Sequence, residues 1–205
     1  MQGHVDNAPE VRRALEAEGF HRFETDTGAE VVLAALRCWG LESALAKLHG
    51  AFALAWWAGQ EKRLTLVRDR MGVAPLHWHQ TPQGSLLFAT ELRALLASDV
   101  VPRRLNTDAL ADQIMHGTVH APNTVVEGIR QLGPGELLVA QDEDLHVHVW
   151  WDPADEALGV DDMRSDARRA HLREVLLDAA SRQLRTASEV GMWLNGSLAN
   201  SALVA

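Results

Sequence analysis

The sequence predicts an α+β fold, in which helices and antiparallel strands follow one another in blocks along a globular chain. The spacing of apolar residues changes near Ala51 from the 3–4 residue period of helices to the short runs and alternation of strands. Turn-rich stretches at 59–61 and 80–84 divide the expected strands into pairs. Hydrophobic residues make up 47% of the 205 residues and charged residues 23%, a globular balance that excludes a chain disordered throughout.

The first half of the chain is expected to contain helices, then strands, then a short helix. Apolar residues three and four apart, with Gly19 and Gly50 as stops, predict the early helices. A continuous apolar run and alternating segments predict the strands. The expected helices are 9–18, 27–38, 42–48 and 90–96, and the expected strands are 51–57, 62–69, 76–79 and 85–89.

The second half begins with a helix and continues with strands. Asn106 is a favourable N-cap for a helix over 107–115. Alternating apolar residues predict strands over 125–129, 136–140 and 145–151. Further on, the sequence predicts a helix over 167–184, a strand over 190–194 and a small-residue segment over 198–205.

The net charge and the length of the apolar runs argue against two classes of partner, nucleic acids and membranes. The formal net charge is -9, and an acidic surface repels phosphate backbones, so no nucleic acid partner is expected. No apolar run approaches the roughly 20 residues that a membrane helix needs, and the polar first residues do not resemble a signal peptide. We therefore expect a cytoplasmic protein without a membrane partner. The single cysteine, Cys38, excludes an intramolecular disulfide.

Three segments carry a resemblance to a known family. Residues 68–76 read Arg-Asp-Arg-Met-Gly-Val-Ala-Pro-Leu and match the pattern RDRxGxxPL, residues 88–95 are similar to FASEIKAL, and residues 126–135 are similar to EGIxxLPPG. In this order the segments resemble the class II glutamine amidotransferase domain of asparagine synthetases. Gly72 and Pro75 favour a turn, so we expect residues 68–76 to be scaffold rather than catalytic.

The resemblance implies a two-part α+β fold. Residues 1–150 would form a truncated N-terminal-nucleophile (αββα) glutamine amidotransferase layer domain that lacks its first strands and its cysteine. Residues 151–165 would be a linker, and residues 166–205 would be the first part of an α/β nucleotide-binding synthetase domain. The family reaction is the ATP-dependent amidation of aspartate with glutamine nitrogen, so glutamine, aspartate, ATP and Mg²⁺ are the substrates and cofactors that the resemblance implies.

The resemblance also implies that the glutamine site is degraded. In the family, an N-terminal cysteine attacks glutamine, and no cysteine lies near this N-terminus. Family residues that hold the substrate align with changed positions, so the chain alone is expected to be an inactive pseudoenzyme. Cys38 is expected to pack in the core. Asp26, two residues from Gly28, is considered as a replacement for the family aspartate but is not favoured. The glutamine-site equivalents are Gln2 for Asn, Gly3 retained, His4 for Glu and Gly28 for Asp.

The last segment resembles a degraded ATP loop. Residues 191–202 are similar to GVLLSGGLDSSxxxA, in which glycines bring backbone N–H groups against phosphate at the start of a helix. Ala199 replaces the Asp, which removes a carboxylate that would help to hold Mg²⁺. We therefore do not expect this chain to bind ATP or Mg²⁺. The ATP-loop equivalents are Trp193, Asn195, Gly196, Ser197, Ala199, Asn200 and Ser201.

Several alternatives stay open at this point. β-Lactam synthetases and lasso-peptide cyclases resemble this family, so one alternative is that the chain is a fragment of such an amide-forming ligase. Another is a non-catalytic remnant that binds a partner, either a second copy or a complementary synthetase chain. Two histidine pairs, His77 with His79 and His146 with His148, suggest a zinc site if their strands meet. Solvated strand faces are the favoured interpretation of these pairs.

Overall fold

The computed structural model describes residues 1–142, 144–156, 165–184 and 190–204. Its internal contacts divide the chain into two compact units, Met1–Glu156 and Ala157–Ala205, and each is described by itself. None of the helices in the described part of the chain is long and apolar enough to cross a membrane.

The first unit begins with a short strand and two helices. Helix α1 is Ala8–Ala17 and helix α2 is Gly28–Lys47. Thr27 caps α2, because its side chain accepts a hydrogen bond from the Glu30 N–H. The backbone leaves helical geometry at Gly40, where φ is 77°. The two helices predicted over 27–48 are thus confirmed as the two halves of one broken helix.

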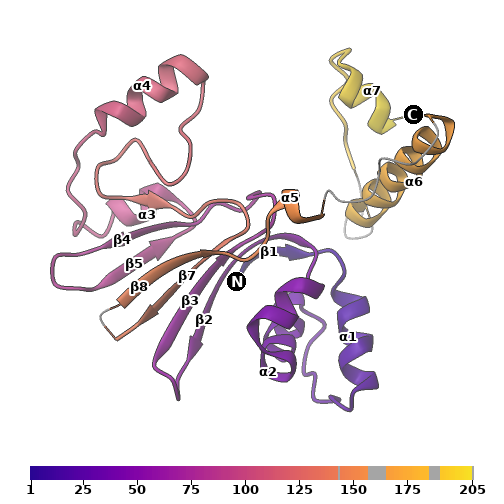
Figure 1. Ribbon diagram of the computed structural model, residues 1–205, viewed down its shortest axis with the longest axis horizontal. Helices are drawn as coiled ribbons and strands as arrows, with labels where there is room; N and C mark the ends of the chain where they lie inside the picture. The colour runs from indigo at the N-terminus through magenta and orange to yellow at the C-terminus, as the bar shows by residue number, and fades with distance from the viewer. Residues whose placement is uncertain (143, 157–164, 185–189, 205) are drawn as a thin grey trace. The chain divides into compact units, whose positions relative to one another are not determined.

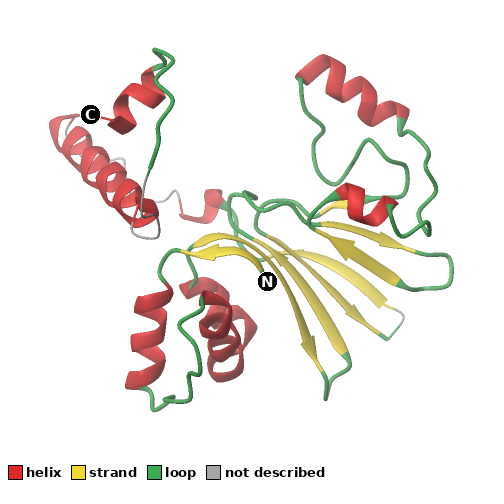
Figure 2. Cartoon of the chain, turned by 180° about the vertical axis from the view of Figure 1, so that it is seen from behind, coloured by secondary structure: helices red, strands yellow, loops and turns green. Residues whose placement is uncertain are grey.

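A five-stranded antiparallel sheet, here called sheet A, forms the centre of the first unit (Figure 2). Its order is β1-β2-β3-β7-β8. The strands are β1 Gln2–Val5, β2 Gly50–Ala58, β3 Arg63–Arg68, β7 Glu136–Gln141 and β8 Asp144–Val149. Strand β1 was not predicted, because its sequence Gln-Gly-His-Val has little strand character of its own and is held by pairing with β2.

A second sheet of three strands, sheet B, has the order β5-β4-β6. Strands β4 and β5 span His77–Gln80 and Leu86–Ala89, and the two-residue strand β6 is Arg130–Gln131. Helix α3, Leu92–Leu96, follows β5, and helix α4, Thr107–His116, is part of the long connection to β6.

Three apolar clusters hold the first unit together as layers. One lies between α1, α2 and one face of sheet A, and includes Leu15, Val32 and Phe52. A second lies between sheets A and B and includes Leu66 and Trp78. The third joins α3 to β5 and the segment before β6. In Figure 1 the two helices lie on one side of sheet A, and β4, β5 and α3 lie on the other.

The strand predicted over 125–129 is not formed. The hydroxyl of Thr124 lies 2.9 Å from the carbonyl oxygens of both Val126 and Ile129, and it accepts a hydrogen bond from the Val126 N–H. These local bonds compete with strand pairing and curl the segment. Regular pairing begins only at Arg130–Gln131.

The second unit consists of helices in its described part. Helix α6 is Ser165–Leu184 and helix α7 is Leu198–Val204. The strand predicted over 190–194 is wrong, since no strand lies among the described residues of this unit to pair with it. None of its described side chains is buried, and Trp193 is 90% exposed. Of the predicted linker, Pro153–Glu156 forms the short helix α5, and residues 157–164 lie outside the described residues.

Candidate functional site

The glutamine-site equivalents gather around β1. Gly3 pairs with Phe52 on β2 and has a φ of +95°. A Cβ at this position would collide with the carbonyl oxygen of Ala51. Gly3 is therefore needed for β1 to pair with β2, whatever other role its backbone has.

A small pocket of about 190 Å³ opens beside the start of β1. Met1 and Gln2 line it together with the middle of β2 and the end of β5. The side-chain amide oxygen of Gln2 accepts a hydrogen bond from the Thr90 hydroxyl. This bond connects β1 to the end of β5, so the Gln2 amide is held on the pocket wall. Thr90 lies in the recognised segment 88–95, but its contact with Gln2 was not predicted.

His4 and Gly28 lie at the other end of β1. The Nε2 atom of His4 is 3.1 Å from an Asp6 carboxylate oxygen. Gly28 is the first residue of α2, and a Cβ placed on it would lie 4.0 Å from the Val5 nitrogen. The structure thus brings all four predicted glutamine-site positions together around one short strand. The changed residues supply an imidazole and a bare backbone where the family pattern has two carboxylates.

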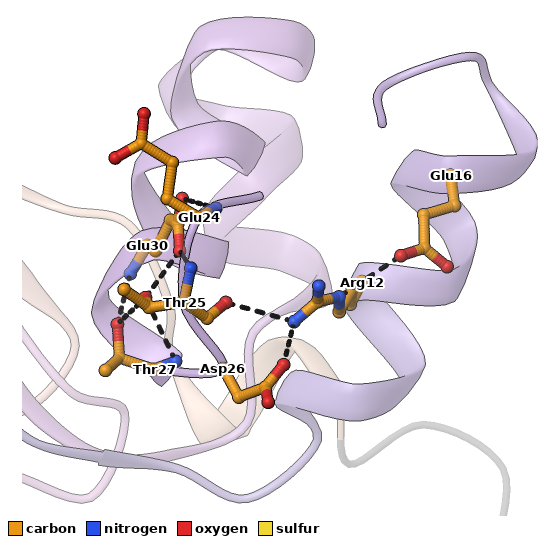
Figure 3. A network of polar contacts seen from close by, with 7 residues as sticks. All are labelled: Arg12, Glu16, Glu24, Thr25, Asp26, Thr27 and Glu30. Atoms are coloured by element: carbon orange, nitrogen blue, oxygen red, sulfur yellow. Dashed lines mark hydrogen bonds and ion pairs between the residues drawn. The ribbon is translucent and has the colours of Figure 1, made fainter. Parts of the chain in front are cut away.

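The carboxylate of Asp26, the considered replacement for the family aspartate, is bonded to Arg12. Its Oδ1 atom lies 2.6 Å from Nη1 of Arg12, which also donates to the Thr25 carbonyl (Figure 3). The Arg12 Nε atom donates to Glu16 at 3.1 Å, and this bond raises the pKa of Arg12, with Asp26 adding to the effect. Asp26 therefore serves to fasten the 24–27 loop to α1.

Glu30 holds the same loop from the side of α2 (Figure 3). Its carboxylate accepts hydrogen bonds from the backbone N–H groups of Glu24 and Thr25 and from the Thr25 hydroxyl. These bonds, first the one from Glu24, lower the pKa of Glu30. The loop that leads into Gly28 is thereby fixed from both helices.

Cys38 is exposed, so the expectation that it packs in the core is wrong. The α2 helix breaks at Gly40, two residues further on, and the neighbouring Trp39 turns its Nε1–H to Glu18 at 2.6 Å. Cys38 lies on the exposed side of the helix with Leu33 and Arg37, whereas Leu36 and Trp39 of the same turn pack in or against the core. Cys38 is absent from the residues that line the pocket beside β1.

Residues 68–75 form a scaffold loop. Asp69 is completely buried and accepts hydrogen bonds from the backbone N–H groups of Met71, Val73 and Ala74. Arg68 donates to three backbone carbonyls, including that of Leu132. Burial lowers the pKa of the Arg68 guanidinium, and the carboxylate of Asp69 partly offsets this effect. Arg68 and Asp69 thus both bind backbone groups, in keeping with the structural role predicted for this segment.

The histidine pairs lie in different sheets. His77 and His79 belong to β4 in sheet B, and His146 and His148 belong to β8 in sheet A. Burial lowers the pKa of His77, which lies opposite Ala89 and close to the pocket. Across the described residues, no group of three or more His, Cys, Asp or Glu side chains is placed to hold a metal ion. The pairs therefore form no zinc site within one described chain.

The ATP-loop equivalents lie in the second unit and bind one another. Asn195 Oδ1 accepts from the Ser197 N–H at 3.0 Å and from the Asn200 side chain at 3.1 Å. The Asn200 side chain also donates to the Trp193 carbonyl, and the Ser201 hydroxyl donates to the backbone carbonyl of Ser197. Gly196 has a φ of +79°, and Ala199 lines an apolar groove with α6. The turn is closed by its own side chains.

Comparisons with known proteins identify the domain to which the β1 cluster belongs. A sequence model of the glutamine amidotransferase domain matches residues 1–151. Glutamine-hydrolyzing asparagine synthetase 3 of Bacillus subtilis (strain 168) is 31% identical over 205 residues, which cover 99% of this chain and 32% of that protein. Asparagine synthetase 1 of the same organism is 27% identical and covers 100% of this chain and 31% of that protein. Amidase chyE of Penicillium rubens is 28% identical over 89% of this chain and 26% of that protein.

Among solved structures, the glutamine phosphoribosylpyrophosphate amidotransferase of B. subtilis in complex with ADP and GMP has a TM-score of 0.49 at 21% identity. This match covers 73% of this chain and 28% of that one. The chain spans about a third of the length of the asparagine synthetases it matches. The domain match over residues 1–151 nevertheless settles the family: the chain belongs to the glutamine amidotransferase domains of the asparagine synthetase family.

Proposed function

We propose that residues 1–156 are a glutamine amidotransferase-like module of an asparagine synthetase-type protein, and that the 205 residues by themselves do not hydrolyse glutamine. One observation carries the second part of this proposal. The only thiol in the sequence, Cys38, is exposed on α2 and is not among the residues that line the pocket beside β1. A thiol must reach the glutamine carbonyl to attack it.

Around β1, several of the other groups that amide hydrolysis uses in the family are replaced or engaged by neighbouring side chains. A competent site combines a nucleophile, a base, donors for the oxyanion and groups that bind the substrate. Gly3 is retained in β1, whereas the Gln2 side chain is engaged by Thr90 and Asp26 is engaged by Arg12. The layers of two helices, sheet A, sheet B and α3 support an N-terminal-nucleophile type of architecture for this module.

For the second unit we propose descent from an ATP-binding segment without retained ATP or Mg²⁺ binding. Ala199 has no carboxylate for Mg²⁺, and Ser197 carries a side chain where the family pattern has glycine. The Asn195 Oδ1 and Asn200 Nδ2 atoms are bonded within the turn. Glutamine, aspartate and ATP are the substrates of the family reaction, and we assign their use to the longer relatives.

Release of ammonia from glutamine by the purified chain tests the proposal. We expect no release above the level of buffer, and we expect Cys38→Ser to match the unmodified chain. Glutamine turnover that disappears in Cys38→Ser would overturn the proposal, because it would make Cys38 the nucleophile.

A non-catalytic, partner-binding role is the second candidate. It is favoured by the exposed apolar side chains of the second unit, among which Trp193 is 90% and Leu198 is 87% exposed. The two candidates differ when a complementary synthetase polypeptide is added. Asparagine formation in the mixture would support the enzyme module, and binding without asparagine formation would support the partner role.

A further inference from the structure

Among the described residues, strand β8 forms an open edge of sheet A, because the sheet order ends with it. The Trp150 N–H donates to the Gly135 carbonyl at 2.8 Å and continues the register of β7 with β8. In an antiparallel ladder, alternate residues of a strand exchange hydrogen bonds with the same neighbour. His146 and His148 therefore direct their backbone N–H and C=O groups to β7. The residues between them direct theirs outward.

The outward-directed residues are Leu145, Val147 and Val149. They present a row of backbone donors and acceptors that can pair with another strand. Their side chains share one face of the sheet, and Val147 and Val149 are 44% and 63% exposed. Residues 144–149 contain no lysine and no proline, which are the residues that commonly block edge pairing.

The opposite face of the same strand carries two imidazoles. His146 and His148 are both exposed, and their ring centroids are 6.1 Å apart. Zinc in proteins takes four ligands, and imidazole nitrogen is one of its preferred donors. Among the described residues of one chain, no third side chain completes the set. A metal site here needs a second pair of histidines from another molecule.

A second copy of the chain supplies that pair. We propose that two copies join β8 to β8 antiparallel about a two-fold axis at Val147, and that one Zn²⁺ binds the four imidazoles. With the axis at Val147, His146 lies opposite His148 of the partner subunit, and His148 lies opposite His146 of the partner subunit. These are the non-hydrogen-bonded pairs, whose Cα atoms are about 4.5 Å apart and whose side chains approach most closely.

The same register is favourable on the other face. Leu145 lies opposite Val149 of the partner subunit, and Val147 lies opposite Val147 of the partner subunit. These are the hydrogen-bonded pairs, so the edge groups are satisfied and the exposed valines gain apolar neighbours. A two-fold axis makes the contact self-limiting at two copies.

Sedimentation of the full chain with added ZnCl₂ tests the proposal. We expect the mass to double from 22.5 kDa, with one zinc per two chains, and to return to that of the monomer when EDTA is added. A chain that stays monomeric with excess zinc, or that binds a zinc ion per monomer, would overturn the proposal.

Three variants locate the site. His146→Ala with His148→Ala should abolish zinc-dependent dimerisation, whereas His116→Ala with His120→Ala should retain it. The second pair is a matched control because its rings are 5.9 Å apart elsewhere in the first unit.

Val147→Pro should also lose the dimer while circular dichroism stays unchanged, because it removes an N–H that points away from β7. Zinc-dependent dimers that persist in His146→Ala/His148→Ala would refute the ligand assignment. Dimers of Val147→Pro with undiminished zinc affinity would refute pairing through the strand edge.

Discussion

Replacing Asp69 by alanine should destabilise the first unit more than any exposed charge substitution. The carboxylate is completely buried and accepts three backbone hydrogen bonds, at 3.1 Å from Met71, 3.0 Å from Val73 and 2.8 Å from Ala74. The substitution leaves all three donors without their acceptor. It also removes the carboxylate that partly offsets the burial of Arg68.

The magnitude follows from these contacts. Hydrogen bonds to a charged group contribute about 1.5–3 kcal/mol each, and an unsatisfied buried donor costs about 1–3 kcal/mol. Met71 and Val73 have exposed side chains, so water can reach part of the loop and the sum is an upper bound. We expect Asp69→Ala to lower the free energy of unfolding by about 3 kcal/mol. Asp69→Asn should cost about half as much, because the amide oxygen still accepts hydrogen bonds whereas the amide nitrogen that replaces the second oxygen cannot.

Urea unfolding followed by tryptophan fluorescence measures the effect. Trp150 reports on the loop, because its indole N–H donates to the Arg68 carbonyl at 3.1 Å. The matched control is Asp144→Asn on the exposed start of β8, which should change the free energy of unfolding by less than about 0.5 kcal/mol. A loss below about 1 kcal/mol for Asp69→Ala would refute the view of this loop as a scaffold held by Asp69.

Two further substitutions test the loops beside the site. Gly72→Ala should destabilise the chain by about 2 kcal/mol, because φ is +64° there and a Cβ would lie 2.9 Å from Pro134; Gly59→Ala is the control, and equal unfolding midpoints in urea would contradict the reasoning. The folded pKa of Glu30 is below the ordinary value of 4.5, so its contribution to stability is present above that pH and is lost as the pH falls through the folded pKa. The Glu30→Gln variant should therefore be less stable than the unmodified chain at neutral pH and should lose less stability on acidification. If the melting temperatures of the two proteins change in parallel over that pH range, Glu30 does not hold the loop.

The elements with strong local signals were predictable from sequence. Asn106 caps α4 as expected, and its side chain accepts from the Ala109 N–H. The apolar run after Gly50 becomes strand β2, and its residues Phe52, Ala53 and Leu54 are buried, so both faces of the strand are covered along this part. The turn predicted in segment 68–76 is formed, with Gly72 at a φ of 64°.

The features that the sequence did not predict share a physical cause: each depends on contacts with residues that are distant in the sequence or on the packing of the whole unit. Strand β1 exists because β2 pairs with it, and residues 190–194 form no strand without a neighbour. Cys38 has apolar neighbours in sequence, yet it lies on the exposed side of α2, and the core takes Leu36 and Trp39 from the same turn. The hydrogen bond between Thr90 and Gln2 joins residues 88 positions apart. No periodicity in the sequence could reveal it.

The reaction of the chain with a diazo ketone analogue of glutamine tests the central claim most directly. Such a compound alkylates the thiol that would attack the glutamine carbonyl, and mass spectrometry of the intact chain and its peptides locates the adduct. We predict that the chain keeps its unmodified mass, because exposed Cys38 is not part of the pocket beside β1. A single adduct on Cys38 that free glutamine prevents would contradict the claim that these residues carry no glutamine-hydrolysing nucleophile.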